Sequence, residues 1–202
     1  MLSIKTRKKY LKNLGFYNGK IDNKNTADYR KAVLNLQKKY FPKDEQDGVY
    51  GKNTEILLRN AERVRLYCKN FKLEEFKCEC NGKYCSRYPA LLNINLLKYI
   101  QKIRTKYGST TITSGLRCPK LNTIVGGASF SKHMDGKALD FVNSGTSTLT
   151  KRKSLINWYI KLLYATYAYC YKYGRTKTRT YTGSHSSVNY PEMGNAVHID
   201  VK

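Results

Sequence analysis

The second half of this chain contains few residues able to do acid–base or metal chemistry. The three histidines of the whole sequence are His133, His185 and His198. Residues 71–202 hold seven carboxylates: Glu74, Glu75, Glu79, Asp135, Asp140, Glu192 and Asp200. Two histidines with one carboxylate can hold a zinc ion and leave its fourth position open, as catalytic zinc sites do. Any catalytic metal site in this half must draw on this short set.

The first candidate pair lies in the stretch Ser131-Lys-His-Met-Asp-Gly-Lys-Ala-Leu-Asp140. Gly136 allows a turn between His133 and Asp140, and the alternation that follows predicts a strand over residues 137–142. Asp140 then projects from the strand on the same face as Ala138. By its spacing alone, a histidine seven residues from an aspartate also fits two unrelated surface residues.

The third candidate, His198, lies in a second alternating segment, residues 196–201. On such a strand His198 and Asp200 share one face, and the valines and isoleucine share the other. Because the apolar face must turn to the core, we expect His198 to face a cleft.

The remaining elements of the second half follow from periodicity. We expect an amphipathic helix over 91–107, a short strand over 110–114 and a long helix over 154–173. Four tyrosines of that last helix recur near helical spacing: Tyr159, Tyr164, Tyr167 and Tyr171. We expect this stripe to pack in the core or at an interface rather than to bind a ligand.

The first 69 residues predict three helices joined by two glycine-containing turns. Apolar residues recur at helical spacing, with lysine and arginine on the opposite faces. Each turn ends in Lys-Asn-Thr, and Thr26 and Thr54 are expected to cap the helices that follow.

These turns carry a resemblance. The series Leu14-Gly-Phe-Tyr-Asn-Gly-Lys-Ile-Asp22, Ala32-Val-Leu-Asn-Leu-Gln37 and Asp47-Gly-Val-Tyr-Gly-Lys-Asn-Thr54 resembles the small three-helix peptidoglycan-binding module. The resemblance implies docking on wall glycan or stem peptide. Tyr17 and Tyr50, at the turns, are candidate contacts.

A second resemblance covers residues 70–202. Ser-x-His-x-x-Gly-x-Ala-x-Asp, followed much later by a strand with His198, resembles the D-Ala-D-Ala carboxypeptidase-like zinc peptidases, which share their fold with hedgehog signalling domains. The resemblance implies that His133, Asp140 and His198 bind Zn2+, whose water attacks an amide carbonyl. It also implies that Arg117, in Ile112-Thr-Ser-Gly-Leu-Arg-Cys-Pro119, contacts substrate and stabilises the developing negative charge.

The general base departs from that family's pattern. Many relatives place a carboxylate three residues before the last histidine or a histidine two before it, where this chain has Asn195 and Ala196. Glu192, six residues before His198 as in the hedgehog-like arrangement, is our first candidate, and Asp200 is the second. Asp200 lies about 6.6 Å along the strand from His198, which also suits a supporting role beside a ligand. His185, Asp135 or no base at all are the remaining alternatives.

The six cysteines leave their chemistry open. Cys78, Cys80, Cys85 and Cys118 could form a structural zinc site, two disulfides or a set of reduced thiols. Cys-x-Cys is less typical of zinc than Cys-x2-Cys, which favours thiols or disulfides over a second metal. Cys68 and Cys170 stand apart.

The charge of the chain predicts a polyanionic partner. Lysine and arginine number 38 against 14 acidic residues, a net charge of +24 spread over both halves. No apolar run approaches the roughly 18 residues of a membrane helix, and no nucleic-acid-binding motif is recognisable. We therefore expect wall polyanions rather than nucleic acid or membrane.

Together these features predict an α+β protein: a three-helix peptidoglycan-binding domain over 1–69 and an α+β zinc peptidase domain over 70–202 with a mostly antiparallel sheet. The expected function is that of a bacteriophage endolysin, a monomeric peptidoglycan hydrolase cutting an amide bond of the stem peptide. No signal peptide is seen, so we expect synthesis in the host cytoplasm and release to the wall. The alternative is a zinc-containing wall-binding protein without turnover, and which bond is cut stays open.

Overall fold

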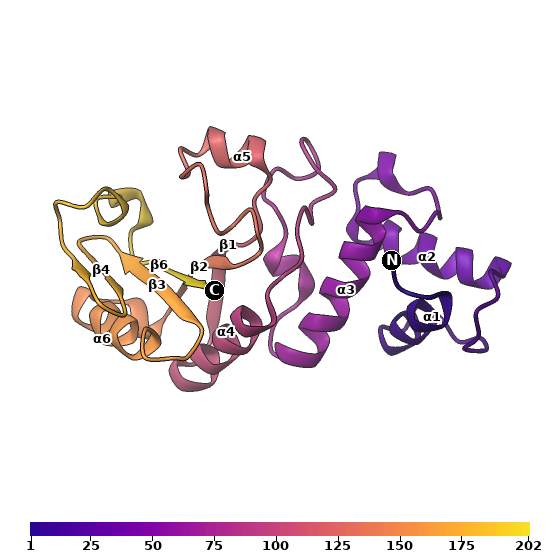
Figure 1. Ribbon diagram of the computed structural model, residues 1–202, viewed down its shortest axis with the longest axis horizontal. Coiled ribbons are helices and arrows are strands. Elements are labelled where there is room, and N and C mark those ends of the chain that lie inside the picture. Colours follow the sequence, from indigo (N-terminus) through magenta and orange to yellow (C-terminus); the bar gives the residue numbers. More distant parts are fainter.

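A computed structural model describes all residues, 1–202. Its first part is a bundle of three helices: α1 (Ile4–Asn13), α2 (Ala27–Tyr40) and α3 (Lys52–Tyr67), with a 3-10 helix at Lys43–Glu45. The bundle forms one end of an elongated molecule (Figure 1). The predicted three-helix organisation is confirmed.

The second part mixes helices with one sheet. In chain order it contains a 3-10 helix Leu73–Phe76, α4 (Ile94–Tyr107), β1 (Thr110–Ser114), α5 (Pro119–Ile124), β2 (Ala138–Asn143), a 3-10 helix Ser144–Thr146, α6 (Leu149–Tyr159), β3 (Ala165–Cys170), β4 (Tyr173–Thr176), β5 (Thr180–Tyr181), 3-10 helices Ser186–Val188 and Pro191–Met193, and β6 (Val197–Val201). The strand order is β1-β2-β6-β3-β4-β5, and every neighbouring pair is antiparallel. The predicted α+β class with an antiparallel sheet is confirmed.

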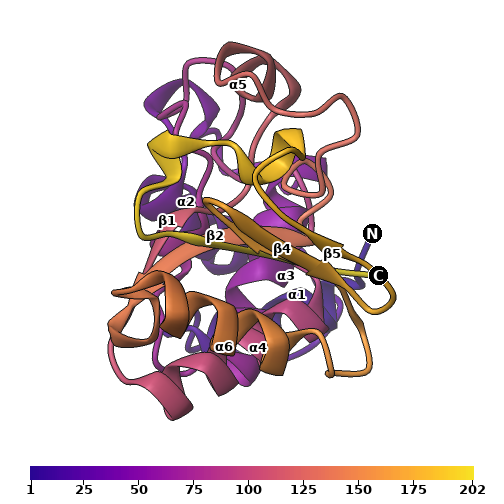
Figure 2. The same ribbon diagram turned by 90° about the vertical axis from the view of Figure 1, so that its left-hand side faces the viewer.

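The sheet has two different faces. Helices α4 and α6 cover one face, while α5 and the 3-10 segments before β6 lie over the other (Figure 2). On β6 the side chains of Val197, Ile199 and Val201 belong to the hydrophobic core. His198 and Asp200 therefore point to the opposite face, as the alternation predicts. No helix is both long and apolar enough to cross a membrane.

The long helix predicted over 154–173 is wrong. Helix α6 ends at Tyr159, and the chain continues as the antiparallel pair β3 and β4, which turns at Tyr171 and Lys172. Tyrosine and threonine favour strands, and the alternation of Tyr167, Tyr169 and Tyr171 competes with the helical spacing that we followed. Pairing of β3 with β6 stabilises the strand.

Two smaller predictions in the bundle also change. Thr26 caps α2 by accepting from the Tyr29 N–H, but α3 begins at Lys52, so Thr54 lies inside the helix. Tyr17 is a core residue whose hydroxyl donates to the Lys20 carbonyl, so its ring is not available to a ligand. The Tyr50 ring is half-buried beneath the Arg7 guanidinium, 3.9 Å from its centroid.

The bundle is joined to the rest of the protein by buried polar contacts. The side-chain amide of Asn60, which is fully buried, donates to the Ala90 carbonyl and accepts from the Leu92 N–H, both at 2.9 Å. Arg63 Nη1 donates to the Leu92 carbonyl at 2.6 Å. Because these contacts satisfy backbone groups of an irregular segment, they fix that segment on α3.

We predict that Gly136→Ala destabilises the protein. Gly136 has φ of +67°, and a Cβ there would lie 2.3 Å from the Leu91 carbonyl oxygen. The left-handed backbone alone costs an ordinary residue about 1 kcal/mol or more, and the clash with backbone adds to it. Urea denaturation should show a loss of more than about 1 kcal/mol.

The matched control is Gly51→Ala, since Gly51 has an extended backbone and open space around it. Equal stability of the two variants would contradict this account of Gly136.

Candidate active site

The register of two strands brings the first two site residues together. Asp140 of β2 lies opposite His198 of β6 in the antiparallel ladder. His198 Nδ1 donates to Asp140 Oδ1 at 2.7 Å. Because paired residues of neighbouring strands have adjacent side chains, strand pairing alone sets this contact.

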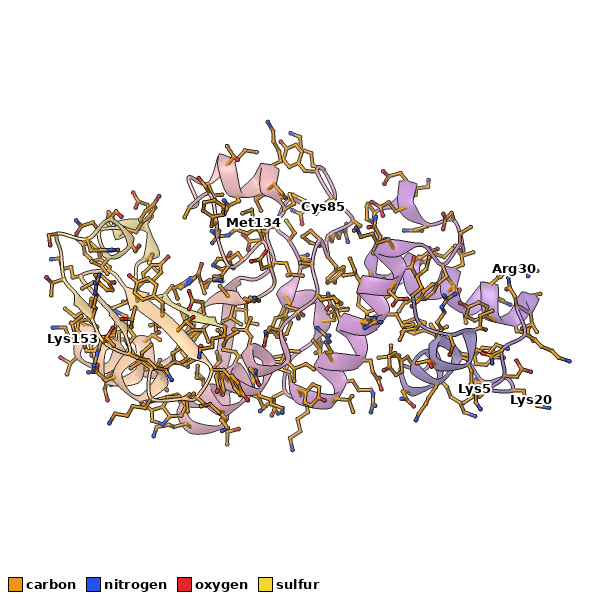
Figure 3. The ribbon with its side chains drawn as sticks, in the orientation of Figure 1. Lys5, Lys20, Arg30, Cys85, Met134 and Lys153 are labelled. Atoms are coloured by element: carbon orange, nitrogen blue, oxygen red, sulfur yellow. The ribbon has the colours of Figure 1, made fainter.

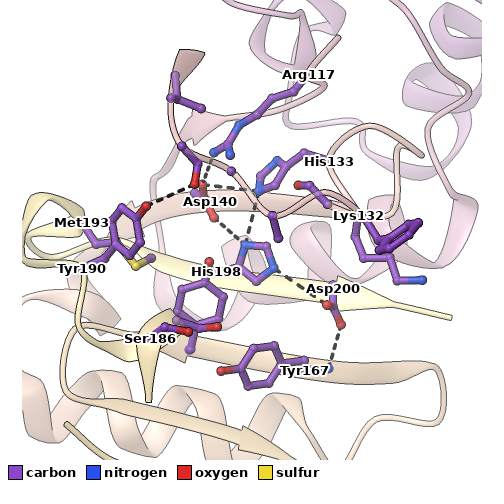
Figure 4. Close-up of a pocket in the computed structure, with 18 residues that line it drawn as sticks. Arg117, Lys132, His133, Asp140, Tyr167, Ser186, Tyr190, Met193, His198 and Asp200 are labelled. Carbon is purple, nitrogen blue, oxygen red and sulfur yellow. Dashed lines mark hydrogen bonds and ion pairs between the residues drawn. The ribbon is translucent and has the colours of Figure 1, made fainter. Parts of the chain in front are cut away.

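His133 reaches the same point from the turn before β2. It is buried, and its Nδ1 lies 2.7 Å from the Gly115 carbonyl, which assigns the proton to that nitrogen. Its Nε2 then faces the pair, 3.3 Å from His198 Nδ1 and 3.5 Å from Asp140 Oδ2. Donor atoms of the three residues all lie within 4.8 Å of one another (Figure 4). Two imidazoles and a carboxylate are a donor set that suits zinc.

Asp200 lies two residues after His198 on β6 and supports that histidine. Its Oδ2 faces His198 Nε2 at 3.9 Å, on the side of the ring away from Asp140. Its Oδ1 accepts from the Tyr167 N–H at 2.7 Å and from the Thr166 hydroxyl, both on β3. Metal-bound histidines usually direct their second nitrogen to a carboxylate or a carbonyl. Both histidines here have such a partner.

Arg117 is held at the same site. Its Nη2 donates to Asp140 Oδ2 and its Nε to Ser114 Oγ, both at 3.0 Å. Its backbone N–H donates to the His133 carbonyl at 3.2 Å. The guanidinium is therefore oriented by β1 and β2 before any substrate arrives.

These residues line a cavity of about 560 Å³. One wall comes from β3, where the Tyr169 ring stacks on His198 with centroids 4.5 Å apart. Tyr167 lines the cavity beside Tyr169, and burial raises the pKa of Tyr167 to about 12. At the rim Phe130 is 95% exposed. The cavity thus combines a polar floor with aromatic walls.

Sequence reasoning missed Tyr167 and Tyr169 as cavity residues. The expectation that the tyrosine stripe packs only in the core holds for Tyr159 but not for Tyr167, which lines the cavity. The signal that could have found them is the alternation over 165–170, read as a strand.

The base candidates lie in different places. Asp200 lines the cavity, whereas Glu192 is exposed on the 3-10 helix Pro191–Met193, between the cavity residues Tyr190 and Met193. His185 and Asp135 are outside the lining. Asn195 turns toward α6, where its Oδ1 accepts from Arg152 Nη1 at 2.7 Å.

The charges of the site are strongly coupled. Burial raises the pKa of Asp140, but His133 and His198 outweigh it and hold that pKa well below its ordinary value. Burial lowers the pKa of His133. Burial also lowers the pKa of His198, but Asp140 and Asp200 outweigh it and raise that pKa to about 9. Without metal, the site therefore holds a protonated His198 against a charged Asp140.

Comparison with known families agrees with this geometry. Residues 69–163 match the family model of Peptidase M15, and residues 3–58 match the model of a peptidoglycan binding domain. The two matched segments follow one another in the same order as the helical bundle and the part that contains the sheet. Members of the M15 family are zinc metallopeptidases, so the predicted enzyme class is confirmed. The protein is a peptidase that acts on peptidoglycan at the cell wall.

The matched segment of the peptidase domain contains Arg117, His133 and Asp140 and ends before His198. A comparison with curated proteins finds no significant match.

We predict that metal-free protein loses stability as the pH rises from about 6.5 to about 9. Because His198 has a pKa of about 9 when folded and near 6.5 when unfolded, its proton stabilises the fold fully below 6.5. That contribution, about 3 kcal/mol, disappears as the pH passes the folded pKa. Urea denaturation of chelator-treated protein measures it.

The control is His198→Gln, which removes this proton and should flatten the profile between these pH values. An equally steep profile in the variant would assign the effect to another group.

Proposed function

We propose that the chain is an endolysin-type hydrolase that cleaves an amide bond of the peptidoglycan stem peptide, with zinc held by His133, Asp140 and His198. The observation that carries the proposal is the convergence of their donor atoms in one cavity, each histidine having a partner on its other nitrogen. The expected division into a binding domain, 1–69, and a catalytic domain, 70–202, belongs to this proposal.

The donor set fits the metal that the family uses. Bound zinc polarises a carbonyl and lowers the pKa of water toward 7. The chain's own part is to hold the three donors in place and to keep Asp140 ionised. The Tyr169 ring stacks on His198, and both histidines are buried.

Arg117 is proposed to stabilise the negative charge that develops on the carbonyl oxygen. A guanidinium has five N–H donors, and two of them are engaged by Asp140 and Ser114. The others remain for substrate. Because Arg117 is already oriented, it needs little reorganisation when the charge develops.

We assign proton transfer to Glu192 and positioning of His198 to Asp200. Both oxygens of Asp200 face protein groups: Oδ1 accepts two hydrogen bonds from β3, and Oδ2 faces His198. Glu192 lies in a cavity-wall segment and makes no hydrogen bond or ion pair, which leaves its carboxylate free to accept a proton.

Wall attachment rests on the N-terminal module and on charge. The module has its own hollow of about 320 Å³ beside residues 41–54, lined mainly by polar side chains. A net charge of +24 attracts teichoic acids or other wall polyanions and disfavours self-association. We expect a monomer, made in the host cytoplasm, that acts after release to the wall.

Digestion of purified peptidoglycan tests the function. We expect new peptide termini by mass spectrometry, their loss with a chelator and their return with added zinc. His133→Ala should bind wall but release no termini, because a donor is missing. If the unmodified protein bound walls of two stem-peptide chemotypes and left both intact, the alternative of a wall-binding protein without turnover would be favoured. Asn195 and Ala196, at positions where many relatives carry a base, motivate that alternative.

Two matched amide substitutions separate the roles of the carboxylates. Glu192→Gln should lower kcat by about 10²-fold or more, with zinc affinity unchanged. Asp200→Asn should lower zinc affinity by about 10- to 100-fold and recover activity in excess zinc. The reverse result would exchange the two roles.

A further inference from the structure

Four cysteines from separate segments meet at a second place in the protein. Their sulfur atoms lie within 4.8 Å of one another, although Cys118 is far in sequence from Cys78, Cys80 and Cys85. Cys78, Cys80 and Cys118 are buried, and Cys85 is half-buried. Figure 3 shows Cys85 on the loop between α5 and the N-terminal helices. None of them belongs to the catalytic cavity.

The contacts between these residues involve sulfur throughout. Cys80 Sγ and Cys85 Sγ are 3.4 Å apart, and all six cysteines of the chain are free thiols. The Cys118 N–H donates to Cys78 Sγ at 3.3 Å, and the Leu121 N–H donates to Cys118 Sγ at 3.5 Å. Backbone N–H groups directed at sulfur stabilise thiolate, which is the form that binds metal.

The charge state of Cys78 agrees with this contact pattern. Hydrogen bonding from Cys85 and the backbone N–H groups of Cys80 and Cys118 outweigh burial and lower the pKa of Cys78 to about 5. Burial raises the pKa of Cys118, and interaction with Cys78 raises that of Cys85. The backbone N–H groups thus favour the thiolate form of Cys78, which is the form that binds a metal ion.

The loop that carries three of the cysteines has no regular secondary structure. Residues 77–93 contain no helix or strand. A turn closes where the Lys83 N–H donates to the Cys80 carbonyl, with φ of 52° at Asn81 and 91° at Gly82. Irregular segments longer than about 15 residues are uncommon inside a compact protein and usually have a function of their own.

We propose that Cys78, Cys80, Cys85 and Cys118 bind a structural zinc ion. Four thiolates close the tetrahedral shell, so no position is left for substrate or water, unlike the histidine–aspartate site. Binding releases the thiol protons to solvent and gives the ion with its four thiolates a net charge of −2. Basic residues of the same segments, Lys77, Lys83, Arg87 and Lys120, can offset that charge.

The place of this site in the fold indicates what it stabilises. Cys118 is the N-cap of α5, and the preceding residue is Arg117, which contacts Asp140 in the catalytic cavity. On the other side, the loop packs on the N-terminal bundle, with the Tyr88 ring edge-on to Tyr40 at 6.2 Å. A zinc ion here would fix the backbone of Arg117 and the join between bundle and sheet.

Metal analysis of the full-length protein, purified under reducing conditions, tests the proposal. We expect two zinc ions per chain. Cys78→Ser with Cys118→Ser should remove one ion and leave the other, whereas His133→Ala with His198→Ala should remove the other. Because the two losses are independent, failure of this proposal is distinguishable from failure of the catalytic-zinc proposal.

Three controls complete the experiment. Cys170→Ser, at a buried cysteine outside the cluster, should keep both ions. Cys85→His should also keep both, since three cysteines and one histidine form a structural zinc set. If the serine variant does not fold, cobalt substitution of the unmodified protein still tests whether the cysteines bind a metal ion. Thiolate ligands give cobalt an intense charge-transfer absorption. Absence of that absorption, or disulfides found by non-reducing mass spectrometry in place of metal, would overturn the proposal.

Discussion

The candidate active site depends on the antiparallel pairing of β2 with β6. It sets Asp140 beside His198 and leaves the apolar side chains of β6 in the core. A register shift of one residue would turn Ile199 to the cavity and His198 to the core, which the burial of the apolar face forbids. His133 meets this pair because Gly136 permits the tight approach of the preceding turn to residues 91 and 92.

Hydrogen bonds and ion pairs from neighbouring residues orient the groups that the strands bring together. The Gly115 carbonyl assigns the tautomer of His133, and Asp200, held by β3, faces the far nitrogen of His198. Arg117 binds the second oxygen of Asp140. Without metal these contacts form a compact set of charges around a proton. Binding a divalent ion would replace that proton, which couples metal affinity to pH.

A small number of contacts also links the two parts of the molecule. Asn60 and Arg63 of α3 satisfy backbone groups at residues 90 and 92, next to the turn that Gly136 packs against. The cysteine loop lies between the bundle and α5, and its Cys78 accepts from the N–H of Cys118, the residue after Arg117. These contacts hold the N-terminal bundle at a defined position relative to the rest of the protein.

Periodicity and one compact motif were enough to predict the three-helix bundle, the strands of Asp140 and His198 and the face on which His198 lies, because these features are encoded locally. Strand β3 could not be predicted in this way, because its residues fit both helical and alternating spacing. Pairing with β6 selects the strand. The contact of Asp200 with Thr166 and Tyr167 depends on that same pairing. The set of Cys78, Cys80, Cys85 and Cys118 was expected from the sequence without a choice of chemistry, and the structure brings their four sulfur atoms within 4.8 Å of one another. Each of these features is a contact between residues far apart in the chain, so it follows from the three-dimensional fold and not from local spacing.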